Sequence, residues 1–228
     1  MIRQGVRRLL DLLLRLDTDR RRSDLRWWEE RARRRGAGAV YHRGHAAEDH
    51  ARIDRWQKEI LYPVLQSRLR GDERRILDYG CGPGRFTPDL ASLIDGRAVG
   101  VDPTQALLDA APRALDVEYR LLRDGRIPLD DDSVDVVWIC LVLTCITDGR
   151  AVREAVAEVE RVLRDDGLLF LVENTAPKKN LRHIAFRSAD EYRALFAFAP
   201  LQHERDYEDR GERISVLTGR KGGGAASA

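Results

Sequence analysis

Three glycines and an acid lie close together in the stretch ILDYGCGPG, residues 76–84. The glycines are Gly80, Gly82 and Gly84, and Asp78 stands two positions before the first of them, at the end of an apolar run. Glycine lets the backbone turn sharply and lets a ligand approach without meeting a Cβ. A pyrophosphate site has a G-x-G-x-x-G spacing, and Asp78 would repel a pyrophosphate. The stretch therefore predicts a site for a ligand that presents a cation, such as an amino group.

The residues that follow alternate between strand-like and helix-like patterns. The clearest helix is expected over residues 148–163, where valines and alanines form one apolar face. Buried strands separated by helices predict an α/β fold with a mostly parallel sheet and helices on both faces. In such a sheet, ligands bind beyond the carboxyl ends of the strands. Strands are expected at RILDY, AVGVD, VEYRL, VDVVWICLVL, LLFLVEN, LQHERDYE and RISVLTG, the last two joined by a hairpin turn at DRGE.

The stretch from residue 74 to about residue 176 resembles the class I S-adenosylmethionine-dependent methyltransferases. Their first motif, D-x-G-x-G-x-G, matches ILDYGCGPG, and their second motif is an acid that closes the next strand, here Asp102. The resemblance implies a Rossmann-like seven-stranded sheet with S-adenosylmethionine as cofactor. It also implies that Asp102 accepts the ribose hydroxyls and that Asp124 binds the adenine amino group. The residues expected to bind the cofactor are Asp78, Gly80, Cys81, Gly82, Gly84, Asp102, Pro103, Asp124, Gly125 and Cys140.

Each acid of this set also has a purely structural interpretation. Asp78 is suited to bracing the glycine turn, and Asp102 to capping a helix that begins near Thr104. Asp124 is suited to capping a turn. Cys81 fits the loop as a small residue, and its surroundings in the sequence give no reason for a lowered thiol pKa. The spacing of all four ordered segments favours the cofactor site.

Methyl transfer needs alignment of the reacting groups and, for some acceptors, removal of a proton. In many small-molecule members of the family the segment after the fourth strand carries a histidine, and here LVLTCITD has Cys145 in that place. The remaining candidates for a catalytic role are Glu173, at the end of the fifth strand, and His183, in the loop after it. The alternatives are a structural hydrogen bond for Glu173 and a solvated surface loop around His183.

Two loops are candidates for contacts with the substrate. The loop APKKNLRHIAFRS, residues 176–188, is basic, and we interpret it either as a site for an anionic group of a small-molecule substrate or as a solvated surface loop. Tyr41 and His45 lie in a segment that commonly forms a lid in the family. The spacing of His42, His45 and His50 does not indicate a metal site.

The chain is expected to comprise four parts. These are a basic amphipathic helical extension (residues 1–36), a helical lid (37–72), the methyltransferase domain (73–220) and a flexible tail (221–228). Within the lid, residues 46–69 are expected to form one helix up to about Pro63 and another after it. The first 35 residues carry 12 arginines against 6 acids, whereas the whole chain has a net charge of +2. Because the basic excess is local, nucleic acid is not an expected partner.

The amphipathic pattern over residues 6–16 has three interpretations: packing on the main domain, a contact in a homodimer, and adhesion to an anionic membrane surface. Asp11 and Arg15 interrupt its leucines, which argues against a secretory leader. Three cysteines without C-x-x-C spacing are typical of a reduced, cytoplasmic protein.

Together these features predict a methyltransferase that moves a methyl group to an oxygen or nitrogen atom of a small-molecule or sugar-type biosynthetic substrate. Two alternatives stay open at this level. One is N-methylation of a protein or peptide, with the acidic run of residues 130–132 holding a basic chain. The other is a non-catalytic scaffold that binds the cofactor, since the sequence shows no evident general base.

Overall fold

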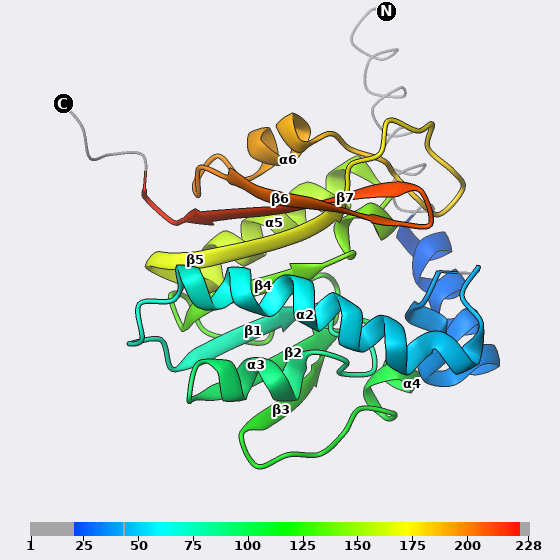
Figure 1. Cartoon of the computed structure of the whole chain (residues 1–228), viewed down its shortest axis with the longest axis horizontal. Helices are drawn as coiled ribbons and strands as arrows, with labels where there is room; N and C mark the ends of the chain where they lie inside the picture. Colours follow the sequence, from blue (N-terminus) through cyan, green and yellow to red (C-terminus); the bar gives the residue numbers. More distant parts are fainter. Residues whose placement is uncertain (1–20, 43, 224–228) are drawn as a thin grey trace, which may run out of the picture.

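The computed structural model describes residues 21–42 and 44–223 (Figure 1). The amphipathic pattern over residues 6–16 lies outside this part of the chain, as does most of the predicted tail. Residues 21–35 are helical and lead through two short 3-10 turns into a long helix. These elements are η1 (Gly36–Val40), η2 (Ala47–Asp49) and α2 (His50–Arg68).

The described residues build a seven-stranded sheet in the order β3-β2-β1-β4-β5-β7-β6. Neighbours from β3 to β5 pair in parallel, whereas β7 is antiparallel to both β5 and β6. The strand order reverses between β1 and β4, which places the expected ligand site at their carboxyl ends. The strands are β1 (Arg75–Tyr79), β2 (Arg97–Asp102), β3 (Val117–Leu121), β4 (Val134–Cys140), β5 (Leu163–Asn174), β6 (Gln202–Asp209) and β7 (Glu212–Arg220).

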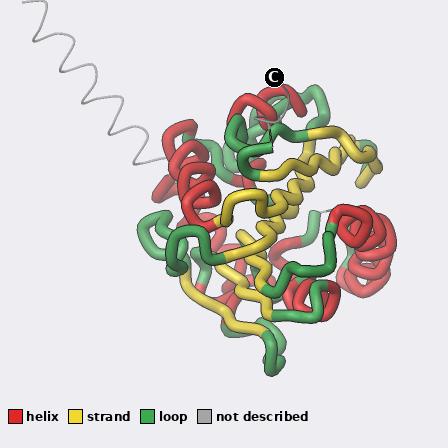
Figure 2. The backbone as a smooth tube through the Cα atoms, turned by 90° about the vertical axis from the view of Figure 1, so that its left-hand side faces the viewer, coloured by secondary structure: helices red, strands yellow, loops and turns green. Residues whose placement is uncertain are grey.

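Helices cover both faces of this sheet, as Figure 2 shows in a view turned by 90°. Successive side chains of a strand point to opposite faces, and β4 divides its residues accordingly. Val137 belongs to the apolar cluster that includes α5 (Gly149–Val162) and α6 (Ala189–Leu195), and Trp138 to the cluster that includes α2 and α3 (Thr87–Leu93). The predicted mostly parallel α/β sheet is thus confirmed. The helices after β1 are α3 (Thr87–Leu93), α4 (Gln105–Leu108), α5 (Gly149–Val162) and α6 (Ala189–Leu195).

One helix boundary in the sequence prediction was wrong. A break near Pro63 was expected, but α2 runs unbroken past this residue. Proline inside a helix removes one backbone hydrogen bond and costs about 3 kcal/mol. Leu61 and Leu65, which flank it, are fully buried against the sheet. We attribute the continuity of the helix to this packing, which offsets the cost of the proline.

The fourth strand is also shorter than its apolar run suggested. The run VDVVWICLVL predicts a strand over residues 134–143, yet β4 ends at Cys140. Leu141 has a φ of 59°, a left-handed conformation that no strand continues through. The chain then turns into η3 (Leu143–Cys145). This early turn brings apolar residues of the run to the carboxyl end of the sheet.

The helix over residues 21–35 lies beside this end of the sheet, at the right of Figure 1. Its Ala32 packs in one apolar cluster with Ala39 of η1 and Leu107 of α4. Within residues 21–42 and 44–223, no helix combines the length and the apolar character that a membrane span requires. The packing of Ala32 holds the helix over residues 21–35 against the sheet domain.

Candidate functional site

The glycine loop follows β1 and is fastened to β2. The backbone N–H groups of Gly80 and Cys81 both donate to the carbonyl of Val101, at 2.8 and 3.0 Å. Gly80 has a φ of 73°, which side-chain-bearing residues rarely adopt. A Cβ on Gly80 would lie 2.5 Å from the methyl groups of Val142. Glycine is therefore required here both by the turn and by the close approach of the loop that follows β4.

Asp102, the last residue of β2, holds the glycine loop through its carboxylate. The N–H of Gly82 donates to its Oδ2 at 3.0 Å, and the N–H of Thr104 donates to its Oδ1 at 2.8 Å. Burial raises the pKa of Asp102 to about 6, although these N–H groups favour its charged form. Each oxygen keeps a second lone pair, so Asp102 can still accept hydrogen bonds from a ligand.

Asp78 lies on the same side of the loop and is fully enclosed. The hydroxyl of Thr87 donates to its Oδ2 at 2.6 Å. Burial raises the pKa of Asp78 to about 7, and the nearby negative charge of Asp102 adds to the increase, against the Thr87 hydrogen bond and the positive charge of Arg85. A buried acid with little positive charge around it favours a cationic ligand group.

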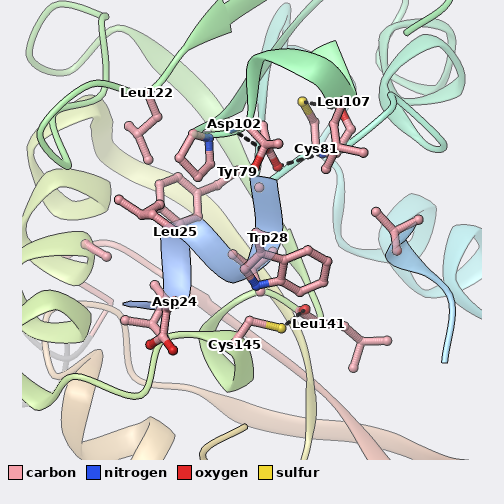
Figure 3. Close-up of a pocket in the computed structure, with 18 of the residues that line it drawn as sticks. Asp24, Leu25, Trp28, Tyr79, Cys81, Asp102, Leu107, Leu122, Leu141 and Cys145 are labelled. Carbon is pink, nitrogen blue, oxygen red and sulfur yellow. Dashed lines mark hydrogen bonds between the residues drawn. The ribbon is translucent and has the colours of Figure 1, made fainter. Parts of the chain in front are cut away.

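These residues surround a cavity of about 450 Å³ at the carboxyl ends of β1, β2 and β4. One wall comes from the helix over residues 21–35, through Leu25 and Trp28. In Figure 3 the Trp28 ring lies between Asp102 on one side and Cys145 on the other. The sequence-predicted cofactor residues that line the cavity are Asp78, Gly80, Cys81, Gly82, Asp102, Pro103, Asp124, Gly125 and Cys140.

Gly84 belongs to the predicted set but does not line the cavity. A Cβ there would lie 2.3 Å from the hydroxyl oxygen of Tyr119, so this glycine allows the loop to pack against β3. Asp124 has a φ of 52°, is exposed and lines the cavity. The Arg21 side chain lies over the neighbouring Gly125, where a Cβ would lie 2.2 Å from its Nη2.

The two predicted catalytic residues do not line the cavity. Glu173 is fully buried behind the loop that follows β4. It accepts hydrogen bonds from three backbone N–H groups of that loop. His183 lies 2.9 Å from the carboxylate of Asp24, which does line the cavity. Cys145, in the place of the expected histidine, also lines it, and burial raises the pKa of its thiol. The catalytic roles of Glu173 and His183 stay predictions.

The basic loop after β5 has protein partners for several of its charges. Lys178 pairs with Glu212 at 2.5 Å. Arg187 donates to the backbone carbonyls of Leu143 and Ile146. Lys179 is exposed, and neither it nor Arg187 lines the cavity. The site for an anionic group that we expected in this loop therefore stays a prediction, with fewer cations available for it.

Tyr41 and His45 of the expected lid also lie outside the cavity. The Tyr41 hydroxyl donates to Asp54 at 2.7 Å, and its ring lies 4.6 Å from the Arg85 guanidinium. His45 pairs with Asp209 at 2.9 Å. Among the described residues, no group of histidine, cysteine and acidic side chains is arranged to hold a metal ion.

Sequence reasoning missed several residues that line the cavity. Leu25 and Trp28 come from a helix that the sequence indicates only as a charged segment containing two tryptophans. That tryptophan pair was the available signal, because large aromatic rings are uncommon in a solvated helix. Arg85 directly follows the glycine motif, and its Nε donates to Asp54 of α2 at 2.7 Å. The other missed residues are Arg21, Arg22, Asp24, Val40, Tyr79, Phe86, Thr104, Leu107, Leu122, Leu141, Val142, Ile146, Ala151 and Ala155.

The strand order 3-2-1-4-5-7-6, with an antiparallel β7 and the glycine loop after β1, defines a Rossmann-like methyltransferase fold. Residues 77–171 match the family described as a methyltransferase domain. This match identifies residues 77–171 as a class I S-adenosylmethionine-dependent methyltransferase domain.

Curated relatives share part of their length with the chain. An uncharacterized methyltransferase of Mycobacterium tuberculosis is 40% identical over 108 residues, which are 46% of this chain and 42% of the relative. The uncharacterized methyltransferase YcgJ of Bacillus subtilis is 28% identical over 58% of each chain. The chain thus spans less than two thirds of the length of these relatives.

Solved structures share the fold. The geranyl diphosphate C-methyltransferase of Streptomyces coelicolor has a TM-score of 0.65 at 14% identity, over 89% of this chain and 97% of that one. The YcgJ structure has a TM-score of 0.57 at 19% identity, over 70% of this chain and 97% of that one. At these identities the likeness extends to the fold alone.

Proposed function

We propose that this protein is an S-adenosylmethionine-dependent methyltransferase that acts on an oxygen or nitrogen atom of a small-molecule or sugar-type substrate. One observation carries the proposal: Asp78, Asp102 and Asp124 come from separate segments and line one cavity beside the glycine loop. The family match over residues 77–171 supports the same cofactor.

The donor set of the cavity fits S-adenosylmethionine. Asp102 keeps free lone pairs for the ribose hydroxyls, and Asp78 offers a buried negative charge to the amino group. We assign Asp124 as the acceptor for the adenine amino group, with apolar Leu122 and the Arg21 side chain lining the same cavity. When bound, the cofactor supplies a methyl group that its sulfonium has already activated. The protein contributes alignment and exclusion of water.

The shape of the cavity supports a small acceptor. Trp28 and Leu25 form a wall of the cavity that must move before a large chain can enter. Among the solved structures of the same fold are enzymes whose names specify geranyl diphosphate and phosphoethanolamine as substrates. Arg85 follows the glycine motif, lines the cavity and pairs with Asp54 at 2.6 Å. We assign its remaining N–H groups to an anionic part of the substrate.

N-methylation of a peptide receives less support. Two of the acids expected to hold a basic chain form ion pairs within the protein: Asp131 pairs with Arg161 at 2.7 Å and Asp132 pairs with Lys221 at 2.8 Å. None of residues 130–132 lines the cavity. A peptide substrate would need another acidic surface.

Two measurements test the proposal. Calorimetric titration with S-adenosylhomocysteine should show binding at one site, and NAD should not compete. Incubation with S-adenosylmethionine carrying a radioactive methyl group should then label a small-molecule fraction and not a peptide library. Binding without any labelled product would favour the scaffold alternative. Absence of binding would overturn the cofactor assignment.

A further inference from the structure

The loop over residues 141–147 forms a wall of the cavity and is held from behind. Leu141, Val142, Cys145 and Ile146 all line the cavity. Leu141 begins the loop with a φ of 59°, a left-handed conformation that is strained for a residue with a branched side chain. Such a conformation persists only where the surroundings fix it. The contacts of this loop therefore determine the shape of the wall.

Glu173, near the end of β5, binds the amino side of this loop. Its Oε1 accepts from the N–H groups of Val142 at 2.9 Å and Leu143 at 2.6 Å, and its Oε2 accepts from that of Thr144 at 3.1 Å. A carboxylate that accepts N–H groups forms stronger hydrogen bonds than a neutral acceptor. The side chain is fully buried, so water does not compete for these groups. Three consecutive backbone N–H groups thus depend on one carboxylate.

Arg187 binds the carbonyl side of the same loop. Its Nη1 donates to the carbonyl of Leu143 at 2.7 Å, and its Nη2 donates to that of Ile146 at 2.8 Å. The positive charge of Arg187 also favours the ionised form of Glu173, whose pKa burial raises to about 7. The two Nη atoms of a guanidinium are held apart in one plane, which suits them to two separate carbonyls. The loop is held between an anion at its N–H groups and a cation at its carbonyls.

We propose that Glu173 and Arg187 are positioning residues that set the wall formed by residues 141–147 against the bound cofactor. The inference rests on the proposed function and goes beyond it, because neither side chain lines the cavity and both act through the loop. The loop reaches the cofactor motif directly: the methyl groups of Val142 lie 2.5 Å from the position of a Cβ on Gly80. A shift of Val142 therefore changes the space at the glycine loop.

This assignment gives Glu173 a role other than that of a general base. Its oxygens are directed at backbone N–H groups, and the hydroxyl of Tyr192 lies 3.4 Å from Oε2. A substrate cannot reach these oxygens without displacing the loop itself. Glu173 also stands at the register position opposite Ser215 in the β5–β7 pair, inside the sheet.

The test compares Glu173→Gln and Glu173→Asp with Glu160→Gln, an exposed control on α5. Glutamine keeps the volume but turns an amide NH2 group toward N–H groups. Amide hydrogen exchange of residues 142–144 should rise about tenfold in Glu173→Gln, while the amides of β1 and β4 keep their rates. Affinity for S-adenosylhomocysteine should fall about tenfold. Glu173→Asp retains the charge and should recover part of both effects.

Arg187→Lys and its exposed control Arg153→Lys complete the set. Lysine keeps the charge but has a single nitrogen in place of two separated donors, so binding should weaken about threefold. Loop exchange that stays at the wild-type rate in Glu173→Gln would overturn the inference. Faster loop exchange with unchanged affinity would also overturn it, since the loop would then not position the site. A wild-type protein that binds no S-adenosylhomocysteine would overturn the proposed function alone, because the exchange comparison needs no ligand.

Discussion

The carboxylate of Asp24 lies 2.9 Å from Nδ1 of His183 and so joins the helix over residues 21–35 to the loop after β5. The same carboxylate accepts from the hydroxyl and the N–H of Thr147, at 2.7 and 3.2 Å. The Trp27 ring stacks on His183 with centroids 4.9 Å apart. Because Asp24 and the neighbouring Trp28 both line the cavity, this contact holds the helix in place as its wall.

We expect Asp24→Asn to loosen this wall. Asparagine can still accept from Thr147 but loses the charge that faces His183, and a hydrogen bond to a charged group is worth about 1.5–3 kcal/mol. The affinity for S-adenosylhomocysteine should fall about tenfold or more, mainly through faster dissociation, measured by stopped-flow fluorescence of the tryptophans. Glu30→Gln, an exposed substitution on the same helix, serves as control. Equal dissociation rates in the two variants would contradict a closing role for Asp24.

Asp102→Ala should weaken cofactor binding most strongly among single substitutions of the acids. The change removes the acceptor for the Gly82 and Thr104 N–H groups and the proposed acceptor for the ribose. Two charge-assisted hydrogen bonds predict a loss of about 100-fold. Isothermal titration with S-adenosylhomocysteine measures it, with exposed Asp116→Ala as control. Wild-type affinity in Asp102→Ala would refute the position of the cofactor.

The sequence allowed the cofactor motif to be predicted because its information is local. Asp78 and the glycines adjoin one another, and Asp102 closes the next strand, so spacing alone brings them to one sheet edge. Contacts between distant segments could not be predicted in this way. Asp24 accepts a hydrogen bond from Thr147, which lies 123 positions later in the sequence. Glu173 was expected at the end of its strand. Its partners are backbone N–H groups, which every residue except proline carries, so the sequence does not identify them.

Gly80→Ala should destabilise the fold more than Gly211→Ala, although both glycines have a φ of 73°. Both substitutions place a Cβ on a residue whose backbone is in the left-handed conformation, which costs about 1 kcal/mol. Only Gly80 adds a clash, since its Cβ would lie 2.5 Å from Val142, whereas the Cβ position at Gly211 has no neighbour within 4 Å. Chemical denaturation should show an additional loss of about 1–3 kcal/mol at Gly80. Equal losses would mean that Val142 moves aside freely.

Cofactor affinity should rise with pH between about 5.5 and 7.5. Burial and the charge of Asp102 raise the pKa of Asp78 to about 7, and the pKa of Asp102 is raised to about 6. The ionised carboxylates favour a bound amino cation, so binding should release protons in this range and weaken as the pH falls through these values. The folding stability of the ligand-free protein depends on pH in the opposite direction to the affinity. An acid whose folded pKa exceeds its unfolded value near 4 loses its stabilising contribution as the pH rises toward 7.

Asp78→Asn separates the two titrations. Its amide oxygen can still accept from Thr87, but it mimics the protonated acid at every pH. The variant should bind S-adenosylhomocysteine weakly at pH 8 and show a pH dependence only below about 6.5, where Asp102 titrates. Titration calorimetry in two buffers with different ionisation enthalpies measures the released protons directly, and Asp116→Asn should reproduce the wild-type profile. A wild-type affinity that stays constant from pH 5.5 to 8 would contradict a charge contact between Asp78 and the cofactor, because the carboxylate changes its charge within that interval.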